Sequence, residues 1–234
     1  MTSILPFDEL NRLSDEIRIR LMESAAQAVG SDEVREDVLD MLLDFFLLSY
    51  AMGNRATNEN LGADWIPQAE DALRSINKKV AGKTWEDRVN DYFDKAKRGD
   101  IPVSPEQREE AKPQEGVPSP QAGKEQGTSS GKEPTGNSFD QINLTDAIIR
   151  ILETEMHRDA NEAALETARH AGAKSKTWIT MMDDKVRDTH DYLLGVTVGI
   201  DDEFYTYDGS HAPAPGMFGV PEEDCNCRCE LEFA

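Results

Sequence analysis

Long apolar runs are missing from this sequence. Its most apolar stretch, residues 38–52, contains Asp40 and Asp44. It is also shorter than the roughly 20 apolar residues that a membrane-spanning helix needs. The first residues lack the basic and apolar segments of a secretory signal. We therefore expect residues 38–52 to form a buried helix in a protein that is made in the cytoplasm and has no membrane partner.

Cysteine and positive charge are both scarce. The three cysteines all lie within residues 225–229, which is not the pattern of a secreted disulfide framework. There are 25 Lys and Arg against 46 Asp and Glu, for a net charge of -21. A surface this acidic repels nucleic acid at long range, so the chain as a whole is not a bulk DNA-binding protein.

The first hundred residues have helical patterns. Apolar residues recur at steps of three and four over residues 5–28, which predicts an amphipathic helix. Ser31 is a good N-cap for a second helix, and we expect that helix to end near Met52, because Gly53 and Asn54 follow.

Two further helices are predicted before residue 100. They cover residues 68–80 and 85–98, and Thr84 is the expected cap of the second. Residues 1–100 are therefore interpreted as a helical docking module, in which no catalytic cluster is visible.

Residues 101–137 differ in composition from the rest of the chain. They are rich in Pro, Gly, Glu, Gln, Lys and Ser and have almost no large apolar residue. Such a segment cannot bury enough surface to offset the entropy of ordering, so we expect a disordered, flexible linker.

A long helix is predicted after the linker, with Thr145 as its cap and Gly172 as its end. Its apolar stripe turns to alanine toward the end, which allows another backbone to approach closely. Thr154, Glu155 and Asn161 lie beside this stripe, and by periodicity we expect them to face solvent.

The last part of the chain has short strand signals at residues 178–181, 196–198 and 204–207. Turns and a loop rich in proline separate them, and residues 225–229 are expected to be extended. The predicted fold class is α+β, with a helical N-terminal bundle, a disordered linker, and a long helix leading into a small mixed domain over residues 138–234.

The order of residues in this C-terminal part resembles a known family. A Thr-Glu pair and an Asn on a helix are followed by K-x-W, D-x-K-V-R-x-x-H, a Gly, a Phe after an acidic turn, a Pro-Gly loop and a closing N-C-R-C. The pattern is similar to that of the Mu F-like minor head proteins of tailed phages, also called head morphogenesis proteins. The matching positions are Thr154, Glu155, Asn161, Lys176, Trp178, Asp183, Lys185, Arg187, His190, Gly195, Phe204, Pro215, Gly216, Asn226, Cys227, Arg228 and Cys229.

The resemblance implies a protein of the phage head. Relatives associate with the portal vertex of the procapsid, and the expected partners are the portal protein and also phage DNA, scaffold or capsid proteins. The implied location is the capsid interior of the virion. Some relatives carry a toxin domain after this block, which we do not expect here. This chain departs from the family in having Leu194 where an Asp is common.

The closing cysteines suggest a metal site as one alternative. Cys225, Cys227 and Cys229 alternate, and together with His190 or His211 they have the residue types of a zinc site. Neighbours on one strand face are roughly 6–7 Å apart, which is too far for thiolates that share one ion unless the segment turns. We therefore expect no cofactor and buried structural cysteines, with zinc as the open alternative.

Two other roles are considered for the same residues. Cys227 or Cys229 with His190 and Asp183 would form a nucleophilic set, but no glycine-rich oxyanion element directly precedes the cysteines. The interpretation that we favour is a buried polar network that holds a loop-rich fold in one arrangement. Its predicted members are Asp183, Arg187, His190, Asn226 and Arg228.

Three lysines, Lys174, Lys176 and Lys185, are candidate DNA contacts within an acidic chain, although we favour a solvated face or ion pairs with Asp183 and Asp184. The leading hypothesis is a non-enzymatic minor capsid protein at the portal vertex, which contacts or leaves with the genome. The alternative is a metal-dependent or cysteine effector enzyme carried in the virion.

Overall fold

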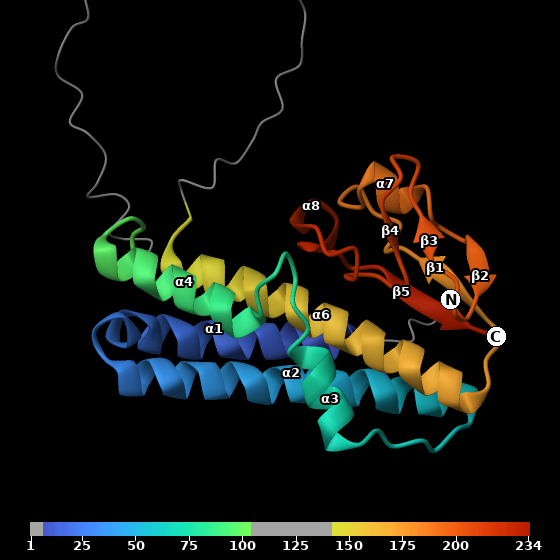
Figure 1. Cartoon of the computed structure of the whole chain (residues 1–234), viewed down its shortest axis with the longest axis horizontal. Helices are drawn as coiled ribbons and strands as arrows, with labels where there is room; N and C mark the ends of the chain where they lie inside the picture. The colour runs from blue at the N-terminus through green and yellow to red at the C-terminus, as the bar shows by residue number, and fades with distance from the viewer. Residues whose placement is uncertain (1–6, 104–141) are drawn as a thin grey trace, which may run out of the picture.

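The computed structural model describes residues 7–103 and 142–234. Its helices and strands are arranged as the predicted α+β class requires: helices first, then a long helix, then a small region with strands (Figure 1). The predicted disordered linker, residues 101–137, lies outside the described residues from position 104 onward. Among the described residues, no helix combines the length and the apolar character that a membrane crossing requires.

The N-terminal helices are α1 (Phe7–Gly30), α2 (Asp32–Leu61), α3 (Ala69–Ile76) and α4 (Trp85–Arg98). Ser31 caps α2 as predicted, because its side chain accepts a hydrogen bond from the Val34 amide at 3.3 Å. Thr84 caps α4 and forms a complete capping box with Asp87.

The predicted end of the second helix is wrong. Helix α2 continues through Gly53 and Asn54 and ends at Gly62, which has φ of 64°. Gly53 stays helical because it packs on another helix: a Cβ there would meet the Ala160 carbonyl oxygen at 2.2 Å. The Asn54 amide donates to Thr167 Oγ1 at 2.8 Å. Both residues therefore join two helices and do not end one.

Helix α6 (Leu144–Ala171) is the axis of the structure. Its cap is Asn143 and not the predicted Thr145, because Asn143 Oδ1 accepts from the Asp146 amide at 2.9 Å. Along one side α6 packs against α1, α2 and α4, and its other side faces the C-terminal region (Figure 1). One continuous core cluster runs from Leu42 in α2 to Leu152 in α6 and Trp178 in the C-terminal region.

The C-terminal region contains β1 (Ser175–Ile179), α7 (Asp188–Asp191), β2 (Thr197–Gly199), β3 (Phe204–Tyr205), β4 (His211–Ala212), α8 (Pro221–Asp224) and β5 (Glu230–Phe233). Strand β1 lies between β2 and β5, with both pairings antiparallel. Alternate residues of β1 are buried, so Lys176 and Trp178 point into the interior. Burying a large apolar side chain contributes about 1.5–3 kcal/mol, which favours this register.

Helix α6 connects the two predicted domains through its packing contacts. It lies inside the predicted C-terminal domain, residues 138–234, yet it makes most of its helix contacts with α2 from residues 1–100. The helical module and the C-terminal region thus share one core, because α6 has buried residues on all sides.

Candidate functional site

The closing cysteine segment turns, and the prediction that residues 225–229 are extended is wrong. Helix α8 ends at Asp224, and Asn226 follows with φ of 56°, in the left-handed region. Asparagine tolerates this conformation better than most residues. The Cys227 amide donates to the Asp224 carbonyl oxygen at 3.2 Å, which closes the turn. The turn redirects the chain before β5, so the three cysteines do not share one strand face.

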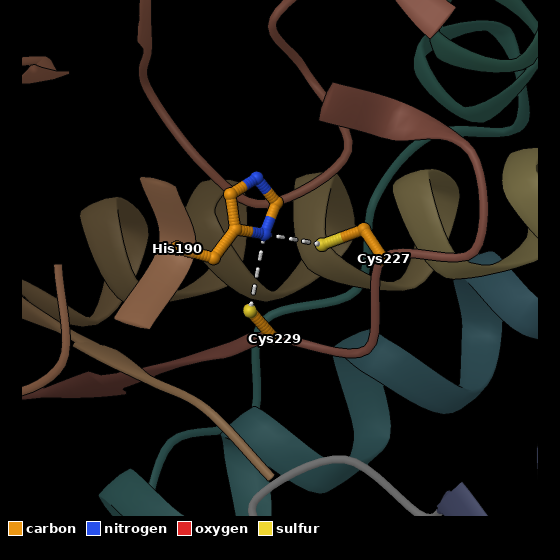
Figure 2. Close-up of side chains that lie close together, drawn as sticks. All are labelled: His190, Cys227 and Cys229. Atoms are coloured by element: carbon orange, nitrogen blue, oxygen red, sulfur yellow. Dashed lines mark hydrogen bonds between the residues drawn. The ribbon is translucent and has the colours of Figure 1, made fainter. Parts of the chain in front are cut away.

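Two of the cysteines meet a histidine in the interior. His190 Nδ1 lies 3.6 Å from Cys227 Sγ and 3.5 Å from Cys229 Sγ (Figure 2). These three ligand-type atoms all lie within 4.8 Å of one another, and all three residues are buried. Cys225 is half-buried and lies outside the cluster. We call His190, Cys227 and Cys229 the His–Cys–Cys cluster.

The His190 ring is held from its other side. Its Nε2 lies 2.9 Å from a Glu223 carboxylate oxygen, and the Thr189 hydroxyl donates to the same oxygen at 2.9 Å. Trp178 packs edge-on against the ring with centroids 5.4 Å apart, and Phe218 stacks on it at 5.5 Å. The contact with Glu223 is close but does not have the direction of a hydrogen bond, so the orientation that directs Nδ1 at the two sulfur atoms is fixed mainly by ring packing. Glu223 was missed at the sequence level, since only the fold brings α8 against α7.

The thiols of the cluster are coupled. A hydrogen bond with Cys229, together with burial, raises the pKa of Cys227 to about 11, whereas the same bond lowers the pKa of Cys229. Cys227 is thus protonated at neutral pH when no ion is bound, which is unfavourable for a nucleophile. Asp183 pairs with Arg228 at 2.6 and 2.8 Å, so the hypothetical Cys–His–Asp set is not assembled.

Four residues of the predicted polar network line one small hollow, namely Arg187, His190, Asn226 and Arg228, but the five predicted members are not joined in one hydrogen-bonded network and make different contacts. Asp183 and Arg228 form a bidentate pair at the surface, and this hydrogen bond from Arg228 lowers the pKa of Asp183 to about 2. The Arg187 guanidinium donates to the Cys225 carbonyl oxygen. His190 belongs to the buried cluster, and Asn226 provides the backbone turn.

Three polar residues of α6 are not solvent-facing, contrary to expectation. Thr154, Glu155 and Asn161 are all buried. Asn161 Nδ2 donates to the Cys229 carbonyl oxygen at 3.2 Å and to the His157 carbonyl oxygen at 3.1 Å. His157 Nε2 also lies 2.7 Å from the Cys229 carbonyl oxygen. These contacts tie α6 to the cysteine segment, and His157 is a second residue that sequence reasoning missed.

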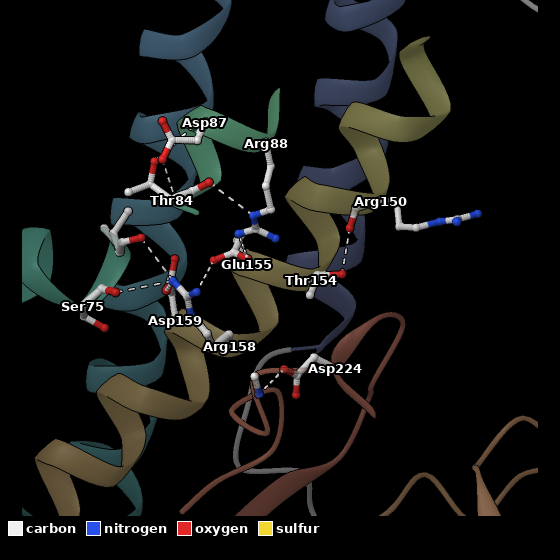
Figure 3. Close-up of polar contacts among 12 residues, drawn as sticks. Ser75, Thr84, Asp87, Arg88, Arg150, Thr154, Glu155, Arg158, Asp159 and Asp224 are labelled. Atoms are coloured by element: carbon white, nitrogen blue, oxygen red, sulfur yellow. Dashed lines mark hydrogen bonds and ion pairs between the residues drawn. The ribbon is translucent and has the colours of Figure 1, made fainter. Parts of the chain in front are cut away.

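A buried group of charges surrounds Glu155 (Figure 3). Glu155 pairs with Arg88 of α4 and with Arg158, one turn further along α6. Arg158 also donates to the Ile76 carbonyl oxygen at 3.2 Å, at the end of α3, where helical carbonyls lack partners. Burial raises the pKa of the neighbouring Asp159 to about 7. The group joins α3 and α4 to α6 through charge-assisted hydrogen bonds.

The three lysines that are candidate DNA contacts differ in their exposure. Lys174 and Lys185 are exposed, but Lys176 is fully buried, with its ammonium 5.6 Å from the centre of the Phe204 ring. Burial lowers the pKa of Lys176 to about 8. In this structure Lys176 is not available to DNA. The alternative zinc residue His211 is exposed and bonds to Glu203 at 2.6 Å, away from the His–Cys–Cys cluster.

Comparison with known proteins identifies the region that contains this site. Residues 136–232 match the family model described as Phage Mu protein F like protein. We refer to this part of the chain as the Mu F-like domain, because it is similar to that family. This agrees with the resemblance seen in the sequence, and the His–Cys–Cys cluster and its contacts to α6 all lie within the domain.

Two curated relatives match over lengths close to that of the Mu F-like domain. Minor head protein GP7 of Bacillus phage SPP1 is 33% identical over 83 residues, which are 34% of this chain and 27% of that protein. An NAD(+)--arginine ADP-ribosyltransferase, EFV, of Enterococcus faecalis is 40% identical over 85 residues, which are 35% of this chain and 17% of that protein. The aligned part is thus less than a third of either relative. No solved structure matches.

Proposed function

We propose that this protein is a minor head protein of a phage that acts at the portal vertex during procapsid assembly. The observation that carries the proposal is the Mu F-like domain over residues 136–232, together with the similarity to a phage minor head protein. The proposed partner is the portal protein, with scaffold or capsid proteins as further contacts, and the proposed location is the capsid interior.

The contacts that the residues of the family motif make support a structural role. Asn161 binds the backbone of the cysteine segment, and Trp178 fills the core beneath β1. A Cβ on Gly216, in the Pro-Gly loop, would lie 3.3 Å from the Arg158 Cα, so the loop rests directly on α6. Each of these motif residues serves to pack the domain, which is what an assembly component needs. We therefore propose a non-enzymatic protein.

The relative with an enzyme name does not change this proposal. The aligned segment is 17% of the ADP-ribosyltransferase EFV, so the activity in that name is said of the whole relative and not of the shared segment. The shared segment is about as long as a Mu F-like domain. A segment of similar length also matches a protein that is named as a phage minor head protein.

The helical part offers a surface for the portal. A groove of about 430 Å³ between α1 and α2 is lined by Arg20, Asp37, Asp40, Met41, Asp44, Phe45 and Leu48. Its lining combines apolar side chains with three carboxylates and one guanidinium, which suits a partner segment that is apolar and basic. We assign this groove to the portal protein.

Contact with the genome is the finer part of the proposal. Within the Mu F-like domain, Lys174 and Lys185 are exposed, whereas the chain as a whole carries a charge of -21. Binding to DNA would therefore be local, weak and strongly dependent on salt.

The proposal is tested by deleting the gene from its phage and supplying the protein from a plasmid. The expected result is that the deletion lowers the yield of infectious particles while portal and major capsid proteins are still made, and that the plasmid restores the yield. An unchanged number of infectious particles without the protein would overturn a role in head assembly.

A further inference from the structure

We propose that His190, Cys227 and Cys229 are the protein ligands of a zinc ion. The residue types fit, because imidazole nitrogen and cysteine sulfur are the donors that zinc prefers in proteins. Because the chain turns at Asn226, the two sulfur atoms lie close to the same ring nitrogen. An extended segment would hold the two sulfur atoms too far apart to share one ion, and the turn removes this obstacle.

The distances between the ligand atoms match tetrahedral zinc. With Zn–S near 2.3 Å and Zn–N near 2.0–2.1 Å, a tetrahedral angle separates sulfur and nitrogen by about 3.6 Å. The observed separations of His190 Nδ1 from the two sulfur atoms are 3.6 and 3.5 Å. Figure 2 shows both sulfur atoms facing the same ring nitrogen, and all three ligand atoms lie within 4.8 Å of one another.

The environment of His190 has the second feature of a metal ligand. A zinc-bound histidine commonly directs its other ring nitrogen to a carboxylate, which fixes the tautomer and makes the ligating nitrogen more basic. Here Nε2 lies 2.9 Å from the Glu223 carboxylate oxygen that also accepts from Thr189. The ring needs a small rotation to turn this close contact into a hydrogen bond. With the proton on Nε2, the Nδ1 lone pair faces the two sulfur atoms.

The site is buried and offers three protein ligands, which leaves one of the four positions around zinc for another ligand. All three ligands are buried. A hollow of about 10 Å³, enough for one water, adjoins His190 and Cys229 and leaves room for a fourth ligand that is not a side chain of the cluster. On binding, each thiol loses its proton to solvent, and the two thiolates and the imidazole nitrogen replace water molecules on the hydrated ion. The ion would join α7 to the segment that precedes β5.

The first test is the metal content of the full-length protein, expressed with zinc and purified without chelator. Elemental mass spectrometry should find about one zinc per chain. Cys225→Ser is the matched control, because Cys225 is nearby in sequence but outside the cluster, and it should keep the metal. Cys229→Ser and His190→Gln should lose most of it. A wild-type protein that binds no zinc would overturn the proposal, as would a Cys225→Ser variant that loses as much as Cys229→Ser.

Two further measurements do not depend on whether the ligand variants fold. Cobalt(II) added to the wild-type protein should give thiolate charge-transfer bands and the intense visible absorption of tetrahedral cobalt. Glu223→Gln should keep the metal but bind it roughly 10–100-fold more weakly. A cobalt spectrum without thiolate bands would contradict the ligand set. A mass two hydrogens lower in freshly purified wild-type protein would reveal a disulfide between Cys227 and Cys229 in place of the ion.

Discussion

The side-chain amide of Asn161, in the middle of α6, donates a hydrogen bond to the Cys229 carbonyl oxygen at 3.2 Å. The two residues are 68 positions apart, and both are buried. Through this bond the central helix of the bundle holds the segment that carries the cysteines. The same amide also binds the His157 carbonyl oxygen, so its loss would remove two buried hydrogen bonds.

Replacing this amide should destabilise the protein. We expect Asn161→Ala to lower the free energy of unfolding by about 1–3 kcal/mol, measured by chemical denaturation, because two buried hydrogen bonds of the amide are lost. The control is Asn77→Ala, which removes a similar bond to the Leu73 carbonyl oxygen at an exposed position, and should change stability by less than about 0.5 kcal/mol. Equal effects of the two substitutions would contradict the proposed link between α6 and the cysteine segment.

The close approach of α2 to α6 should not tolerate a methyl group. A Cβ at Gly53 would lie 2.2 Å from the Ala160 carbonyl oxygen, so we expect Gly53→Ala to cost about 1–3 kcal/mol of stability through overpacking. At Gly30, nothing lies within 4 Å of the corresponding position. Gly30→Ala should therefore be neutral or slightly stabilising. Thermal unfolding of both variants checks the pair, and a harmless Gly53→Ala would show that the helices are further apart.

Lys176 should destabilise the fold at neutral pH through its buried charge. Burial lowers its pKa from 10.5 to about 8. Between these values the unfolded chain binds more protons than the folded one, so this residue makes stability rise with pH across that window. Lys176→Met should therefore be more stable than the wild type at pH 7, with the difference shrinking as pH rises toward 10.5. Denaturation at several pH values measures this.

The exposed Lys174 provides the comparison for this experiment. Lys174→Met should change stability by less than about 0.5 kcal/mol and add no dependence on pH in this range. A Lys176→Met variant that is less stable than the wild type at pH 7 would mean that the contact of the ammonium with the Phe204 ring outweighs the cost of burial.

The α1–α2 groove should determine binding to the portal. Leu48→Glu places a further negative charge in a lining that already contains Asp40 and Asp44, and we expect capture of the protein by purified portal rings to weaken by about tenfold or more. Leu73→Glu is the control, because Leu73 of α3 has a similar exposure (39% against 43%) but lies outside the groove. If portal rings captured both variants equally well, the portal contact would have to lie outside the groove.

Local chemistry made part of the fold predictable. Ser31 and Thr84 cap helices because a side-chain oxygen meets an amide within the same turn, which sequence shows directly. The continuation of α2 through Gly53 was not predictable, since its reason is a contact with Ala160 more than a hundred residues later. A glycine at a helix end and a glycine at a helix crossing look alike in sequence.

The sequence predicted the residue types of the site but not how the fold arranges them. The sequence proposed His190 with Cys225, Cys227 and Cys229 as one candidate metal site, and the structure brings three of these residues together without Cys225. The turn at Asn226 and the contact with Glu223 depend on the fold. Thr154, Glu155 and Asn161 were assigned to solvent because a single apolar stripe was visible on α6. That helix is covered on both sides, and its second covered side is polar because it binds backbone and charges.

The central claim is that this protein is a minor component of the phage head. The measurement that tests it most directly is quantitative mass spectrometry of purified procapsids and mature particles, with the copy number normalised to the portal ring. The account predicts a low and fixed ratio to portal in procapsids. Absence of the protein from both procapsids and mature particles would contradict it and would favour an effector role.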